Sequence, residues 1–124
     1  MAANKVTRWG PVALSSTLTT NILNPGTTTG GVGMNGTDNN LYFVIRHIRI
    51  VNKTAGAVTA SFWLGLTGAN TAGTEVIGQG LSVPANSYID WFGLLRLNTV
   101  DFLVGGASAA TSLSYEAEGE IGDA

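Results

Sequence analysis

Apolar and polar residues alternate one by one along two long stretches of this chain. Every second side chain is apolar between residues 57 and 67, and the same alternation recurs between residues 111 and 121. Successive side chains of a β-strand point to opposite faces, so a period of two indicates strands with one buried face. Gly, Thr, Ser and Asn are common throughout, and these residues disfavour helices. The buried face is predicted to include Val58, Phe62, Leu64, Leu113, Tyr115 and Ile121.

Further strands are expected between segments rich in turn-forming residues. Residues 41–52 form a long apolar run whose phase changes near Arg46 and His47, so either both faces are buried or a bulge lies there. A turn at residues 52–56 would join this strand to residues 57–67 as an antiparallel hairpin. Short strands at this spacing predict a single antiparallel β-sandwich of the jelly-roll type. The other candidate strands are residues 12–23, 75–77, 80–83, 88–97 and 101–104.

The first forty residues differ from the rest of what we expect to be one domain. Residues 1–24 are predicted to be an arm or an edge strand, residues 25–40 a long Gly/Thr/Asn loop, and residues 41–124 the body of the sandwich. The arm and the loop contain few large apolar residues, and ordering each residue costs about 1–2 kcal/mol. We therefore expect both to pack on partner chains. Deleting residues 1–11 should then weaken assembly and leave the sandwich folded.

The composition limits the kinds of partner. Only 11% of the residues are charged, against about a quarter in a typical domain, which favours a chain whose surface is covered in an assembly. A secreted sandwich with a neutral surface is the alternative. With six Lys and Arg residues and a net charge of −2, the chain lacks a basic cluster for nucleic acid. No apolar stretch suits a membrane helix or a secretory signal, so we expect no membrane contact and synthesis in the cytoplasm.

No combination of residues indicates catalysis. The only histidine, His47, lies inside a predicted strand and is flanked closely by arginines, which favours a structural or interface role. Residues 31–36 match the spelling GxGxxG, but no strand precedes them and no helix is expected after them. With one His and no Cys, a transition-metal site is not expected. The sequence therefore predicts a protein that is not an enzyme and that binds no cofactor.

Three carboxylates project from one side of the last predicted strand. Glu116, Glu118 and Glu120 are spaced two residues apart, so a strand places them in a stripe. Such a stripe either pairs with arginines, within the chain or on a neighbour, or binds a hard cation. We expect ion pairing, and the candidate cations are Arg46, Arg49 and Arg96.

Several residues are candidates for contact with partner chains. Trp63 lies opposite the predicted core face, so it is either covered by an edge of the second sheet or an interface anchor. Trp9 and the aliphatic residues after it would dock on a neighbouring subunit, and the loop would add its two largest apolar side chains. The predicted interface comprises Trp9, Val12, Leu14, Val32, Met34, Trp63, Glu116, Glu118 and Glu120.

Three segments carry a resemblance to a known group of proteins. They are VIRHIRIVNKT, with the pattern R-x-I-x-I-x-N-x-T; VPANS, before a Trp-containing strand; and a last strand with EGEIG. Over about residues 12–122 the chain resembles small virion proteins of tailed bacteriophages, of the capsid decoration or minor structural type. The resemblance rests on strand and turn patterns and carries no catalytic signature.

The resemblance implies a β-sandwich that attaches to a viral shell or tail. The first hypothesis is a decoration (cement) protein on the capsid surface of the virion, which bridges subunits of the major capsid protein. It would also contact copies of itself, as a homotrimer, after synthesis in the host cytoplasm. The alternative is a minor tail or tail-tip protein that contacts a host receptor or glycan.

Overall fold

The computed structural model describes residues 5–27 and 41–123, and this part of the chain contains eight β-strands. No helix among these residues has the length and hydrophobicity needed to cross a membrane. The strands are β1 (Lys5–Ala13), β2 (Asn21–Leu23), β3 (Leu41–Asn52), β4 (Val58–Gly65), β5 (Leu81–Val83), β6 (Ser87–Leu97), β7 (Phe102–Ala107) and β8 (Leu113–Asp123).

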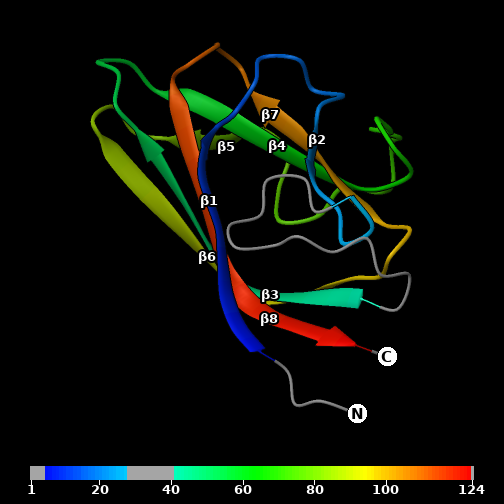
Figure 1. The fold of residues 1–124 in the computed structure, drawn as a ribbon. Coiled ribbons are helices and arrows are strands. Elements are labelled where there is room, and N and C mark those ends of the chain that lie inside the picture. Colours follow the sequence, from blue (N-terminus) through cyan, green and yellow to red (C-terminus); the bar gives the residue numbers. More distant parts are fainter. Residues whose placement is uncertain (1–4, 28–40, 124) are drawn as a thin grey trace.

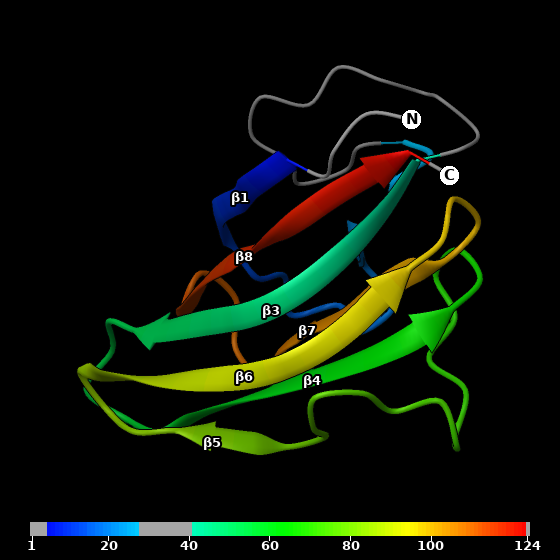
Figure 2. The same ribbon diagram turned by 90° about the horizontal axis from the view of Figure 1, so that it is seen from below.

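The strands form two antiparallel sheets of four strands each (Figures 1 and 2). The first sheet has the order β1-β8-β3-β6, and the second has the order β2-β7-β4-β5. Apart from β4 and β5, consecutive strands lie in different sheets, and this order is that of a jelly roll, which contains two Greek keys. The prediction of a single antiparallel β-sandwich is confirmed.

The core lies between the sheets and receives side chains from both. Val58, Phe62, Leu113 and Tyr115 are buried as predicted, while Leu64 and Ile121 are partly buried and pack against the same cluster. The rings of Phe62 in β4 and Tyr115 in β8 have their centroids 6.4 Å apart, so they join the two sheets. Alternation in β4 and β8 therefore identified the core face correctly.

Strand β3 contains a bulge, which is one of the two explanations given for its phase change. Its pairing with both β8 and β6 changes register between Ile45 and His47. Ile45 and Ile48 are both buried although they are three positions apart along the chain, which a regular strand does not allow. Opposite the bulge, a Cβ on Gly119 would lie against the carbonyl oxygen of Val44, so only glycine fits there.

The predicted hairpin between residues 41–52 and 57–67 is wrong. Strand β3 lies between β8 and β6 in the first sheet, and β4 lies in the second sheet. The turn between them is a corner held by the buried side chain of Asn52. Its Nδ2 donates to the carbonyl oxygens of Gly56 (2.9 Å) and Val83 (3.0 Å), and its Oδ1 accepts from Thr54 N (2.9 Å). The same turn residues thus direct the chain to the opposite sheet.

The N-terminal segment forms edge strands, one of the two alternatives predicted for it. Strand β1 pairs with β8 at one edge of the first sheet, and β2 pairs with β7 at one edge of the second. Of the predicted loop, residues 25–27 are described, whereas residues 28–40, including Val32, Met34 and the GxGxxG spelling, lie outside the described residues.

Residues 75–77 do not form the strand that was predicted there. Glu75 makes an isolated β-bridge with Trp63, and the backbone nitrogen of Val76 donates to Phe62 O (3.1 Å). The segment therefore follows the edge of β4 beyond the short strand β5, through single hydrogen bonds and without a continuous ladder.

Candidate protein-binding face

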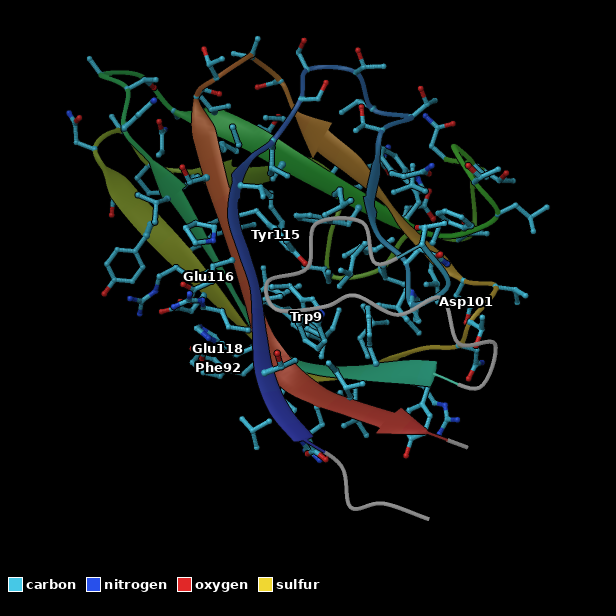
Figure 3. The ribbon with its side chains drawn as sticks, in the orientation of Figure 1. Trp9, Phe92, Asp101, Tyr115, Glu116 and Glu118 are labelled. Carbon is cyan, nitrogen blue, oxygen red and sulfur yellow. The ribbon has the colours of Figure 1, made fainter. Side chains whose placement is uncertain are left out.

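Charged and aromatic side chains gather on the side of the first sheet that faces away from the second sheet. We call this surface the first-sheet face. Figure 3 shows Trp9 and Tyr115 between the sheets, whereas Glu116, Glu118 and Phe92 lie on the other side of the first sheet. Its members include Val6 and Arg8 from β1; Glu116, Glu118 and Glu120 from β8; Arg46, His47, Arg49 and Val51 from β3; and Tyr88, Asp90, Phe92, Leu94 and Arg96 from β6.

The strand register sets these side chains in rows across the sheet. One row runs from Arg8 through Glu118 and His47 to Phe92. The neighbouring row contains Glu116, Arg49 and Asp90. Directly opposite residues in antiparallel strands have their Cβ atoms about 4.5–5.5 Å apart, so each row forms a chain of neighbours.

Ion pairs within the chain hold most of the charged groups of the first-sheet face. Arg46 Nε donates to Glu120 Oε2 at 2.7 Å. Arg49 binds Asp90 through two hydrogen bonds, from Nε at 2.8 Å and from its second terminal nitrogen at 3.0 Å. The predicted pairing of the acidic stripe with arginine is thus confirmed for Glu120.

The imidazole of His47 lies between two carboxylates. Its Nε2 is 2.8 Å from Asp90 Oδ1, and its Nδ1 is 3.3 Å from Glu118 Oε1. A neutral imidazole has one N–H, so only the protonated ring can donate to both oxygens. Hydrogen bonds from Arg49 and then from His47 lower the pKa of Asp90 to about 2, which keeps this carboxylate ionised.

Exposed apolar groups lie among these charges. Phe92 stacks on His47 with ring centroids 4.7 Å apart. The rest of the Phe92 side chain is open to solvent, since this residue is 73% exposed. Tyr88 lies under the guanidinium of Arg49 at 4.4 Å, in a cation–π contact. Leu94 and Val6 are also largely exposed. The face therefore combines paired charges with apolar surface that the described residues leave uncovered.

The concentration of charge here contrasts with the rest of the molecule. Four of the six Lys and Arg residues of the chain belong to the first-sheet face, and so do four of the eight Asp and Glu residues. The four arginines balance the four carboxylates, so the face is close to neutral when His47 is neutral. These residues are Arg8, Arg46, Arg49 and Arg96, and Asp90, Glu116, Glu118 and Glu120.

Three predicted interface residues require correction. Trp9, Leu14 and Trp63 are 0%, 3% and 3% exposed in the single chain, so they have no surface left for a partner. Trp9 is part of the core, with its ring 4.7 Å from that of Phe43. Val12 is half-buried and packs against the same cluster. Trp9, Val12 and Leu14 thus pack within the chain and do not act as an arm.

Sequence reasoning missed the outward side chains of β6. Tyr88, Asp90, Phe92 and Leu94 alternate with residues that pack on the core, and this alternation is visible in the sequence. However, both faces of β6 carry large apolar residues, such as Trp91 and Phe92, so the pattern alone does not distinguish the core face from the exposed one.

No protein-family model matches the sequence, and no curated protein matches it either.

Proposed function

We propose that this chain is a non-enzymatic structural protein of a bacteriophage virion that binds the outside of the capsid shell through its first-sheet face. There it would stabilise the shell by bridging subunits of the major capsid protein. The observation that supports the proposal is the make-up of this face, where arginines and exposed aromatic residues lie together. Tyr and Arg are enriched at protein interfaces and in the residues that dominate their binding energy.

The pairing of charges on the face supports the same function. A charge that loses water without a partner opposes binding, whereas a hydrogen-bonded ion pair avoids that penalty. Asp90 already accepts hydrogen bonds from Arg49 and contacts His47, and Arg46 already pairs with Glu120. A partner protein could therefore cover these groups without leaving them unpaired. The jelly-roll architecture is also one that recurs in viral capsid and lectin domains.

The surroundings of His47 support a role without catalysis. A general base of the Ser-His-Asp kind needs one ring nitrogen directed at a nucleophile. Both nitrogens of His47 face carboxylate oxygens, and its ring is stacked on Phe92. We accordingly assign His47 to the ordering of the first-sheet face.

Particle binding tests the proposed function with two matched variants. Val6 on the first-sheet face is 87% exposed, and Val100 in the turn between β6 and β7 is 70% exposed. We expect Val6→Asp to reduce co-sedimentation with capsids assembled without this chain at least tenfold, since a carboxylate would be buried in the interface. Val100→Asp should bind like the wild type.

Two results would contradict this function. One is equal binding by both variants, and the other is the absence of peptides from this chain in purified virions, measured by mass spectrometry.

A tail protein that contacts a glycan is the second candidate. The exposed rings of Tyr88 and Phe92 lie on the same face of β6, about 13 Å apart along the strand. Asp90 lies between them, which is the combination of flat apolar rings and polar groups that a sugar-binding surface needs. Binding of the labelled protein to a glycan array, lost in Tyr88→Ala and Phe92→Ala, would favour this candidate over the capsid.

A further inference from the structure

Strand β6 is the longest edge strand of the sandwich among the described residues. Exposed strand edges bind other strands, and natural proteins usually protect them by shortness, bulges, proline or lysine. Strands β2 and β5 have three residues each. Strand β1 contains Pro11 and changes register between Trp9 and Val12. Strand β6 has eleven residues without Pro or Lys. Its register with β3 shifts between Phe92 and Leu95, yet no strand in the described part of the chain pairs with its outer edge.

The outward side chains of β6 are complementary to themselves in an antiparallel arrangement. Inward and outward positions alternate along the strand in spite of its register shift against β3, because a Cβ on Gly93 would meet the ring of Trp91 and therefore points to the core side. The outward series is Tyr88, Asp90, Phe92, Leu94 and Arg96.

One register satisfies both the charges and the apolar groups of this series. If two copies of β6 pair about a two-fold axis at Gly93, Asp90 of each copy lies opposite Arg96 of the other. Phe92 of each copy then lies opposite Leu94 of the other. Opposite charges and apolar pairs that face each other across strands stabilise a sheet. A shift of the axis to Phe92 would instead place Asp90 opposite Leu94.

We propose that β6 pairs with β6 of a second copy of this chain, antiparallel and centred on Gly93. The contact is isologous, so it closes at two copies. The two first sheets become one sheet of eight strands, and the two first-sheet faces become one continuous surface with Phe92 and Leu94 of both copies at its centre.

This dimer deepens the proposed function, because it provides a doubled face with which to bridge shell subunits. It differs from the trimer that the sequence resemblance implied. Dimer formation is measured on the purified protein without particles. Absence of the dimer is therefore distinguishable from absence of capsid binding. A dimeric protein that does not bind capsids would contradict the proposed function alone.

A charge-complementation experiment tests the pairing. Sedimentation equilibrium is measured at protein concentrations up to about 1 mM. We expect the full chain to have twice its monomer mass of 12.8 kDa. The variant with Phe92→Asp and Leu94→Asp should be monomeric, and so should the variant with Phe92→Lys and Leu94→Lys, because like charges would face each other. An equal mixture of the two variants should regain the dimer mass.

The mixture also controls for folding, because two misfolded variants would not form a defined dimer. A monomeric wild type overturns the proposal, and so does a mixture that stays monomeric. Wild-type mass retained by either variant alone would show that the dimer uses another surface, which also overturns it.

Single cysteines determine the register, because the chain has no cysteine of its own. Oxidising a mixture of Phe92→Cys and Leu94→Cys chains should give more disulfide-linked dimer than oxidising either variant alone, since a disulfide requires closely spaced Cβ atoms. Preferential cross-linking of Phe92→Cys with itself would place the axis at Phe92 and overturn the register centred on Gly93.

Discussion

Asp90 is the residue that organises the first-sheet face, and its environment makes a prediction about acid stability. The pKa of this carboxylate is lowered to about 2 by Arg49 and then His47, from an ordinary value near 3.9. A lowered pKa stabilises the folded state above the unfolded-state pKa, and this contribution is lost as pH falls from about 4 to about 2. We expect Asp90→Asn to melt at a lower temperature than the wild type at pH 7, with the difference disappearing towards pH 2.

Thermal melting followed by circular dichroism across this pH range measures the effect. Arg49→Gln removes the main cause of the lowered pKa of Asp90. We therefore expect Arg49→Gln to change the melting temperature less in the Asp90→Asn background than in the wild type. A difference between wild type and Asp90→Asn that is constant from pH 7 to pH 2 would contradict the role of Asp90.

At the scale of the element, strand β1 belongs to the core and does not act as a separable arm. Trp9 is fully buried, and β1 pairs with β8 from Lys5 to Ala13. We expect Trp9→Ala to lower the free energy of unfolding by about 3–5 kcal/mol, because it leaves a large cavity. Val6→Ala in the same strand should change it by less than about 0.5 kcal/mol, since Val6 is exposed.

Urea denaturation of both variants measures this contrast. Deleting residues 1–11 should likewise unfold the sandwich or strongly destabilise it, in place of the selective loss of assembly that the sequence suggested. A truncated chain with the stability of the wild type would contradict the assignment of β1 to the core.

At the scale of the whole molecule, the two sheets share one core and should unfold together. Phe62 in the second sheet contacts the cluster that contains Tyr115 in the first. We expect Phe62→Ala to cost about 3–5 kcal/mol and to reduce hydrogen-exchange protection in β8 as much as in β4. Leu66→Ala, which alters a 72% exposed side chain just after β4, should leave both unchanged. Loss of protection confined to the second sheet would show that the sheets unfold independently.

Local patterns predicted the class of fold and much of the core. Alternation in β4 and β8 identified Val58, Phe62, Leu113 and Tyr115, because a strand with one buried face repeats every two residues whatever its partners are. The phase change near Arg46 and His47 likewise indicated the bulge, since Ile45 and Ile48 are an odd number of positions apart in the sequence.

The tertiary structure decided which strands are neighbours and which apolar residues remain exposed. The turn after Asn52 is compatible with both a hairpin and a corner, and the buried contact with Val83, distant in sequence, selects the corner. Trp9 and Trp63 were candidates for an interface, but strands distant in sequence cover them, whereas Phe92 stays exposed at an edge. The sequence by itself therefore determined the two-residue period of the strands and the buried faces of β4 and β8. Pairing and burial depend on contacts between residues far apart along the chain, and a local pattern does not contain that information.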